Sequence, residues 1–387
     1  MKKQIKRVSV FLLTAGLGAA LFLLLAYAGK GTSGPFESLF SSLNSGIVTI
    51  EKQILNIQQK RLNSMNVFVK ERDNTQWLKS PDFTLYGVYD DLTAETYEPV
   101  IQLEDSLKTK FPLIQIYTAW GSKREQVFPF LRVQAIYDLG SIPVVTWEPW
   151  LNDFDPQRYN WIKESEDPNK NGLSAIARGD FDNYIDNWAG AAARFGHPLF
   201  LRLGHEMNDP YRYPWGPQNN DPKDFIAAWR HIVERFRFAG ANNVIWIWSP
   251  HPGYLDFDMY YPGDNYVDWI GLTALNYGTV ATWSRWWTFR EVVNESYTIL
   301  SEYSKPIMIS ELGSLNVGGE RDLWFGDALK LIHGEYSAVK AVLFFHVNSD
   351  ITVTYKSLDW SFKGDSSVIS EIKKNLKSVE FINEIVQ

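Results

Sequence analysis

Residues 199–208 read LFLRLGHEMN, a short apolar run that ends in polar residues. From about Asp82 onward, similar β-branched and aromatic runs alternate with longer polar or helical stretches, an order typical of βα units in a parallel sheet. The runs are Phe83–Tyr89, Leu113–Tyr117, Ile142–Trp147, Leu199–Leu203, Val244–Trp248, Val267–Ala274, Pro306–Ile309 and Val342–His346. The amphipathic helices predicted between them include Phe181–Phe195, Asp224–Phe238 and Trp287–Tyr303. Eight such runs predict an α/β fold, the (β/α)₈ or TIM barrel.

Size and composition fit this architecture and exclude several classes of protein. The chain has 387 residues, 45% of them hydrophobic, and a (β/α)₈ barrel takes up roughly 250 residues or more. A formal net charge of −7, with no basic block beyond the N-terminus, argues against a nucleic-acid partner. The absence of cysteine excludes disulfides and thiolate metal sites. The 16 tryptophans and 19 tyrosines suit either a core or platforms for sugar faces.

Residues 1–30 are predicted to be a transmembrane anchor or signal segment. Basic residues at positions 2, 3, 6 and 7 precede an uncharged, mostly apolar run over residues 8–28. About 20 such residues span a bilayer as a helix, and the basic flank stays in the cytoplasm. We therefore expect an extracytoplasmic protein that this helix anchors to the cell membrane. The alternative is secretion after cleavage near Ala28, but the run exceeds the ~7–15 residues of a signal-peptide core.

Residues 31–75 are predicted to be a helical linker to a catalytic domain over residues 76–387. Pro35 suits the first position of a helix. Apolar residues then recur at alternating spacings of four and three: Phe36, Phe40, Leu43, Ile47, Ile50, Ile54 and Ile57. This is the pattern of a coiled coil, so self-association through residues 36–57 is one interpretation. The other is a helix packed along the outside of the barrel.

The carboxyl ends of barrel strands carry the chemistry in this architecture. In chain order these ends hold Asp90, Trp120, Trp147 with Glu148, His205 with Glu206, Trp248 with His251, Asn276 with Tyr277, Glu311 and His346. Few polar groups and many indoles converge on one rim, as in a sugar-binding cleft. We expect Trp120, Trp147 and Trp248 to contact substrate. Glu148 is expected to bind a sugar hydroxyl or to order its loop.

Glu206 and Glu311 are the predicted catalytic pair. They follow the fourth and seventh runs, and these strands face each other across the mouth of an eight-stranded barrel. Retaining glycoside hydrolysis needs two carboxyls ~5–5.5 Å apart, one to attack the anomeric carbon and one to protonate the leaving oxygen. We expect burial or negative charge to raise the pKa of the acid. This chemistry requires no cofactor and no metal ion.

Several short motifs carry a family resemblance. They are WEPW at 147–150, ARGDFDNYI at 177–185 with WA at 188–189, RLGHEMN at 202–208, YPWG at 213–216, WIWSP at 246–250, YPG at 261–263, VDWIG at 267–271 and SELG at 310–313. In this order the chain, from roughly Phe83 to Lys374, resembles glycoside hydrolase family 26, part of a clan of retaining barrel hydrolases.

The resemblance implies roles for individual residues. Glu206 matches the acid/base, His205 the histidine that precedes it, and Glu311 the nucleophile. Tyr277 sits where such barrels place an aromatic hydroxyl against the nucleophile. Trp215 corresponds to an aromatic residue that stacks on a sugar face.

Two further residues are expected behind the substrate, Arg202 paired with a carboxylate, and Asn208. The family often has glycine after the asparagine, whereas this chain has Asp209 followed by Pro210. Glycine permits unusual backbone angles or a close approach of the sugar. Asp209 is therefore expected to reshape that subsite.

The implied activity is a retaining endo-β-glycanase that acts on a β-linked polysaccharide by double displacement. Members of the family cleave β-1,4-mannan, mixed-linkage β-1,3-1,4-glucan or β-1,3-xylan. The motifs at 147–150 and 213–216 look closer to those of the members that cleave glucan, which favours β-1,4 bonds of mixed-linkage glucan, with mannan as the alternative. An alternative of another class is a non-catalytic, membrane-anchored polysaccharide-binding barrel, which would have no reason to keep both carboxylates.

Overall fold

The computed structural model describes residues 58–162, 166–351 and 357–376. The predicted membrane segment and residues 36–57 lie outside these ranges. The chain divides at Arg61 into two units, and the fold below is that of Arg61–Gln387. Within the described residues, no helix combines the length and the apolar character that crossing a membrane would require.

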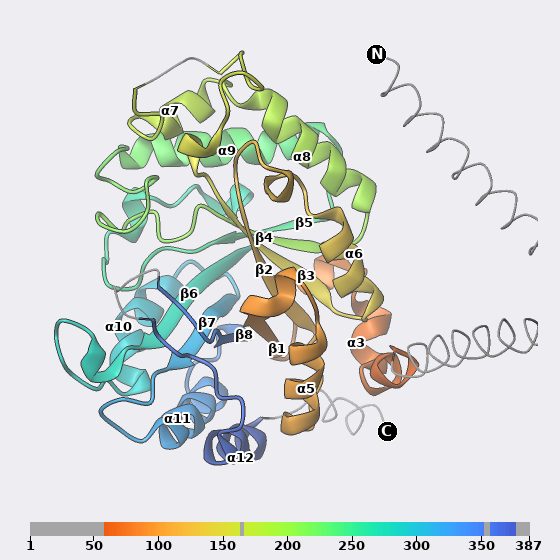
Figure 1. The fold of residues 1–387 in the computed structure, drawn as a ribbon, viewed down its shortest axis with the longest axis vertical. Coiled ribbons are helices and arrows are strands. Elements are labelled where there is room, and N and C mark those ends of the chain that lie inside the picture. Colours follow the sequence, from red (N-terminus) through yellow and green to blue (C-terminus); the bar gives the residue numbers. More distant parts are fainter. Residues whose placement is uncertain (1–57, 163–165, 352–356, 377–387) are drawn as a thin grey trace, which may run out of the picture. The chain divides into compact units, whose positions relative to one another are not determined.

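Eight parallel strands close into a barrel in chain order, with β1 paired to both β2 and β8 (Figure 1). The strands are β1 (Leu85–Asp90), β2 (Leu113–Ala119), β3 (Ile142–Glu148), β4 (Leu199–Leu203), β5 (Val244–Trp248), β6 (Trp269–Asn276), β7 (Ile307–Ser314) and β8 (Val339–His346). Each predicted run overlaps one strand, and the bounds of β4 and β5 agree residue for residue. The predicted (β/α)₈ barrel is confirmed.

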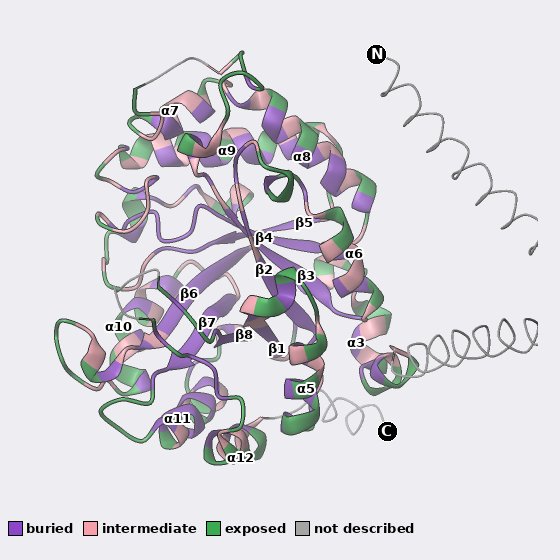
Figure 2. Ribbon diagram, viewed as in Figure 1, coloured by how far each residue is buried: buried purple, intermediate pink, exposed green. Residues whose placement is uncertain are grey.

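Helices cover the outside of the barrel. They are α3 (Asn66–Glu71), α4 (Thr75–Leu78), α5 (Glu98–Leu107), α6 (Phe130–Asp138), α7 (Gly172–Ala177), α8 (Asp182–Phe195), α9 (Pro222–Phe238), α10 (Phe289–Ser301), α11 (Arg321–Gly334) and α12 (Ser366–Asn375). Between β5 and β6 the chain forms two short 3₁₀ turns instead, Phe257–Met259 and Asp264–Tyr266. The strands are buried, whereas the helices expose their outer faces to solvent (Figure 2).

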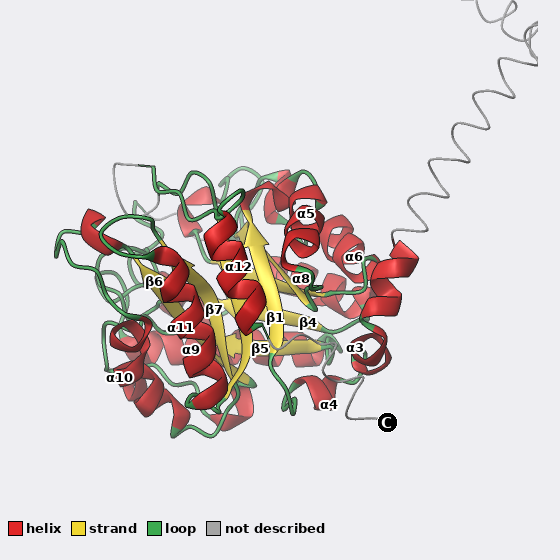
Figure 3. Cartoon of the chain, turned by 90° about the horizontal axis from the view of Figure 1, so that it is seen from below, coloured by secondary structure: helices red, strands yellow, loops and turns green. Residues whose placement is uncertain are grey.

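The amino-terminal end of the barrel is closed by residues that precede β1. Met65 lies just before α3, Phe68 lies in α3 and Leu78 ends α4. All three share one apolar cluster with the first residues of β1, β2 and β3. The indole of Trp269, at the start of β6, donates to the carbonyl oxygen of Leu78 at 2.9 Å. In Figure 3 the arrow of β1 points away from α4. The opposite end is therefore where the strands present functional side chains.

A buried ion pair fixes the segment before α3 to α5. The guanidinium of Arg61 donates to the carboxylate of Glu104 at 2.6 Å, and both side chains are almost completely buried. Arg61 also donates to Ser141 and to the carbonyl oxygen of Phe111. Because each charge is paired and hydrogen-bonded, the contact is tolerated in the interior.

Candidate active site

A cleft of about 470 Å³ lies at the carboxyl ends of the strands, within the ~300–1,000 Å³ typical of ligand sites. Four of the predicted site residues line it: Glu148, His205, Tyr277 and Glu311. Its other walls include four residues that the sequence did not single out, namely Tyr117, Trp150, Arg212 and Tyr213. Aromatic walls with a few convergent polar groups are the chemistry that a carbohydrate ring requires.

The end of β4 adopts a backbone that few residues tolerate. Gly204 has φ +46° and Glu206 has φ +53°, and a non-glycine residue in this region costs of order 1–3 kcal/mol. The backbone N–H of Glu206 donates to the carbonyl oxygen of Ser249 at 2.7 Å. The side chain of Asn208 accepts from the N–H of His251 at 2.6 Å, so the loop after β4 is bound to the loop after β5. These bonds hold the strained turn that aims Glu206.

Glu311 lies inside β7 and is clamped by two donors. Arg202 Nη1 donates to Glu311 Oε1 at 2.6 Å, and the hydroxyl of Tyr117 donates to the same oxygen at 2.9 Å. Both donors lie on strands, β4 and β2. Burial is the largest influence on Arg202 and alone would lower its pKa. Glu311, followed by Tyr117 and Glu206, together outweigh burial and raise that pKa, so the guanidinium stays charged. Arg202 thus pairs with a carboxylate, as the resemblance implied.

One hydrogen-bond network joins the two glutamates. Thr273 Oγ1 donates to Glu206 Oε1 at 2.9 Å and accepts from Arg202 Nη2 at 3.3 Å, and Arg202 in turn holds Glu311. A register shift between Leu272 and Thr273 brings Thr273 opposite Glu311 in the pairing of β6 with β7. The residues from β4, β6 and β7 therefore form one connected site.

Glu206 has a second partner, which the sequence did not predict. Arg212 Nη1 donates to Glu206 Oε2 at 2.9 Å. Burial alone would raise the pKa of Glu206, but Arg212, then His251, Arg202 and the Thr273 hydroxyl, lower it below its usual value. Our expectation of a raised pKa was wrong for the empty cleft, because cations rather than a second carboxylate dominate around Glu206.

Near neutral pH, His205 is uncharged and Glu148 is partly protonated. Burial raises the pKa of Glu148 to about 7, although the indole of Trp150 donates to its carboxylate at 3.1 Å and partly opposes the rise. Burial, followed by Arg202 and Arg212, lowers the pKa of His205 well below its usual value. His205 Nε2 lies 3.0 Å from the hydroxyl of Tyr213. This side of the cleft therefore offers an uncharged imidazole and a carboxyl that gains or loses its proton near pH 7.

Comparison with known proteins places the chain in a family. The model for "Glycosyl hydrolase family 26" matches residues 168–311, a segment that begins before Glu206 and ends at Glu311. Endoglucanase H of Acetivibrio thermocellus is 31% identical over 277 residues, which is 68% of this chain and 27% of that protein. The chain belongs to glycosyl hydrolase family 26.

Other relatives of this family 26 chain are more distant. The mannan endo-1,4-beta-mannosidase of Bacillus subtilis is 27% identical over 136 residues, 33% of each protein. The solved catalytic domain of the GH26 endo-beta-1,4-mannanase of Bacillus sp. JAMB-750 has a TM-score of 0.58 at 17% identity, over 81% of this chain and 90% of that one, which shows a common fold. The chain spans about a third or less of the length of the two curated relatives.

The four tryptophans predicted to contact substrate occupy the core of this family 26 barrel. Trp120, Trp147 and Trp248 are fully buried, and the rings of Trp120 and Trp147 pack 4.5 Å apart. Trp215 is 2% exposed, and its indole donates to the carbonyl oxygen of His205 at 2.7 Å. Stacking on a sugar requires an exposed ring face, so the structure corrects this interpretation for all four rings.

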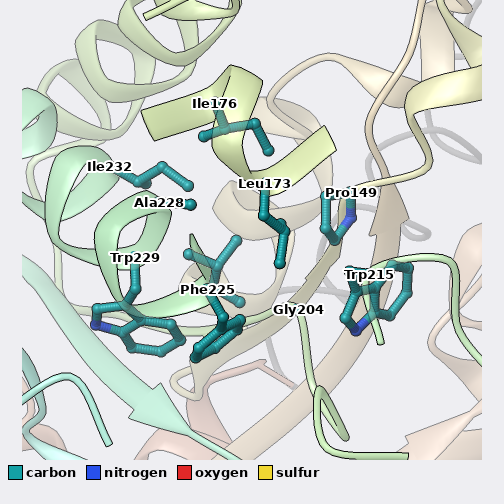
Figure 4. A pocket seen from close by; sticks show the side chains of 10 residues that line it. Pro149, Leu173, Ile176, Gly204, Trp215, Phe225, Ala228, Trp229 and Ile232 are labelled. Atoms are coloured by element: carbon teal, nitrogen blue, oxygen red, sulfur yellow. The ribbon is translucent and has the colours of Figure 1, made fainter. Parts of the chain in front are cut away.

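Trp215 instead supports the residue that does reach the cleft. It borders an apolar void of about 10 Å³ below the loop after β4, together with Leu173 and Phe225 (Figure 4). Its ring stacks on that of Tyr213, with centroids 4.7 Å apart and planes 10° from parallel. Tyr213 lines the cleft. The aromatic surface predicted for Trp215 is therefore presented by its neighbour in the YPWG motif.

The hydroxyl against Glu311 comes from Tyr117 rather than from Tyr277. Tyr277 lines the same cleft and packs edge-on against Trp360, with centroids 4.9 Å apart. Tyr117 is the last residue of the predicted second run, and its position at the carboxyl end of a strand was a signal that the sequence contained. Arg212 offered no such signal, because it lies in a loop.

Three titratable side chains gather beside Glu206 at this end of the barrel. Glu206, Asp209 and His251 offer ligand atoms within 4.8 Å of one another, but the Arg212 cation already pairs with Glu206. Asp209 is 3% exposed and accepts from the N–H of Tyr211 at 2.8 Å, so it orders the loop where the family often has glycine.

His346 forms hydrogen bonds with both Asp90 and Ser361, each at 2.9 Å. The order of these side chains matches that of a serine-hydrolase triad. All three residues are buried, however, and none of them lines the cleft. These hydrogen bonds therefore connect β1 to β8 and β8 to the segment before α12.

Proposed function

We propose that this protein is a retaining endo-β-glycanase in which Glu311 is the nucleophile and Glu206 the acid/base. The observation that carries the proposal is the network in which Thr273 and Arg202 connect the two carboxylates beside one cleft. Glu311 is held rigidly by Arg202 and Tyr117, as a nucleophile that must attack one carbon requires. We assign Glu206, on the turn after β4, to the leaving-oxygen side of the bond to be cleaved.

In the proposed reaction, Glu311 attacks the anomeric carbon while Glu206 gives its proton to the leaving oxygen. A covalent glycosyl-enzyme forms, and Glu206 then takes a proton from the water that hydrolyses it. Two inversions restore the starting configuration. The uncharged His205 and the partly protonated Glu148 line the cleft, where they can exchange hydrogen bonds with sugar hydroxyls.

We propose a β-1,4-linked glucan, with mixed-linkage β-1,3-1,4-glucan first, as the substrate. The relation to an endoglucanase over 68% of the chain supports glucan. Mannan is the second candidate, supported by the mannan endo-1,4-beta-mannosidase relative at 27% identity. Digestion of mixed-linkage glucan, mannan, cellulose and xylan with the full-length protein separates them, and release of oligosaccharides from xylan alone would reject both.

Product stereochemistry tests the mechanism on whichever glycan is cleaved. NMR of the first products should show the β-anomer before mutarotation. Glu311→Ala should be inactive, with azide able to occupy the vacated space. Glu206→Ala should be slow on polysaccharide and far less impaired in glycosylation by a substrate with a good leaving group, which needs little protonation. An α-anomer as first product would refute the assigned roles.

We also keep as a proposal that residues 1–30 place this domain outside the cytoplasmic membrane, where it trims a polysaccharide that its own cell exports. The sequence of that segment supports it. Mature protein found free in the medium, with its N-terminus at Gly29, would contradict an anchor.

A further inference from the structure

Both carboxyl oxygens of the proposed acid/base already accept a hydrogen bond within the protein, so neither is free to act. Thr273 Oγ1 donates to Oε1 of Glu206, and Arg212 Nη1 donates to Oε2, each at 2.9 Å. A general acid must carry a proton and present it to the leaving oxygen of the substrate. One of the two donors therefore has to give way.

The two donors differ in freedom. Thr273 is buried on β6 and is also bound by Arg202 at 3.3 Å. Arg212 lies on the loop after β4, and its side chain is 22% exposed. Among the residues that the structure describes, its guanidinium lines the cleft, whereas Glu206 behind it does not. Arg212 can move into solvent or along the ring of Tyr213, which lies 5.2 Å away. Arg212 is therefore the partner that gives way.

We propose that Arg212 is a removable counter-ion, which pairs with Glu206 in the empty cleft and yields that place to the sugar on the leaving-group side. The proposal rests on the acid/base role proposed for Glu206. Arg212 lines the cleft and holds Oε2 of Glu206 behind it, and the acid has to reach the leaving oxygen from there. The guanidinium thus occupies the position of the incoming sugar and, once displaced, can donate to hydroxyls of that sugar. It is a positioning residue that also contacts substrate.

The electrostatics set the direction of the effect. The groups near Glu206 come from several elements. They are Arg202 on β4, Asp209, Arg212 and Tyr213 on the loop after it, His251 and Tyr254 after β5, Thr273 and Tyr277 at β6, and Glu311 on β7, which Arg202 joins to the network. Burial raises the pKa of Glu206, and Arg212 is first among the groups that lower it. An arginine beside a carboxylate lowers its pKa by roughly 1–3 units. The empty enzyme should therefore lose its acid at a lower pH than the complex does.

The test is the pH dependence of Arg212→Met. The basic limb of the pH profile of kcat/KM reports the pKa of the acid in the free enzyme. The basic limb of the kcat profile reports its pKa in the complex with substrate. We expect the limb of kcat/KM to move to higher pH by roughly one unit or more, and the limb of kcat to stay, because the substrate has already displaced Arg212. Arg212→Gln, which keeps a donor without the charge, is the second variant. Arg290→Met removes a charge from an exposed pair with Glu335 and should move neither limb.

Equal movement of both limbs would mean that Arg212 stays on Glu206 in the complex, and movement of neither would mean that it does not control the acid. Either result overturns the proposal. If no glycan is cleaved, the proposed function fails, and an NMR titration of the Glu206 carboxyl in the wild type and Arg212→Met still decides the pairing. A higher pKa in the variant supports it, and equal values overturn it.

Discussion

Glu148→Gln should abolish a loss of stability that the wild type suffers as pH rises. The side chain of Glu148 is 16% exposed, and burial raises its pKa from 4.5 to about 7. A raised pKa in the folded state means that the folded protein binds this proton more tightly than the unfolded chain does. The bound proton of Glu148 therefore stabilises the folded protein fully below pH 4.5, and this stabilisation is lost as the pH rises through 7. Glutamine does not titrate and shows no such loss.

The size of the effect follows from the difference in pKa. From 4.5 to about 7 is 2.5 units, and at 1.36 kcal/mol per unit this is about 3 kcal/mol of unfolding free energy. Urea unfolding of both proteins at half-unit steps from pH 4.5 to 8.5 measures it. The difference, variant minus wild type, should rise by about that amount and level off above pH 7. Glu95→Gln, at an exposed position, is the matched control and should give a flat difference.

Two outcomes would refute this reasoning. A flat difference for Glu148→Gln would mean that water or a polar partner solvates the carboxylate as well in the folded protein as in the unfolded chain. A difference that falls with pH would mean that the folded protein prefers the ionised form, as in an ion pair with His205, whose Nδ1 lies 4.0 Å away. The lowered pKa of His205 argues against that pair.

Two further predictions concern single contacts. Tyr117→Phe removes one hydrogen bond to Glu311, and a bond to a charged group is worth roughly 1.5–3 kcal/mol, so kcat/KM should fall roughly 10- to 100-fold with unchanged unfolding midpoint within a few degrees; unchanged kinetics would make the bond incidental. Arg61→Met leaves Glu104 buried without its arginine and should lower the free energy of unfolding in urea by roughly 3–5 kcal/mol. The double variant Arg61→Met with Glu104→Leu should recover most of that loss. A double variant as unstable as the single one would contradict this.

The sequence was sufficient to predict the barrel, because an apolar run of strand length indicates a strand that is buried on both faces. It was less informative at the carboxyl ends of the strands. The predicted seventh run stopped at Ile309, but β7 continues to Ser314 through Ser310 and Glu311. Both residues are buried in the strand: Ser310 Oγ donates to the carbonyl oxygen of Met308 in the same strand, and Glu311 accepts from Arg202 and Tyr117 on other strands. A pattern based on hydrophobicity cannot register that kind of burial.

The site was predictable in its carboxylates and less so in its partners. Glu206 and Glu311 follow the fourth and seventh predicted runs, so barrel geometry alone predicts that they lie at the same end of the barrel. Their partners depend on details that one sequence does not encode locally. The position of Arg212 depends on a loop, and that of Thr273 on a register shift between β6 and β7. The indoles were misplaced because a tryptophan at the end of a strand fits the core and the cleft equally well, and only packing decides between them.

The contacts of the two carboxylates differ in the way that their proposed roles require. A nucleophile must keep one position, and Glu311 is held by Arg202 and Tyr117, both of which lie on strands and cannot leave without disturbing the barrel. An acid/base must gain and lose a proton in each cycle, and Glu206 combines one fixed donor on a strand with one donor on a loop. The strained turn at Glu206 adds to this, because its backbone bond to Ser249 holds the carboxyl in place while Arg212 moves. In this barrel, the strands provide the constant part of the site and the loop after β4 provides the part that changes.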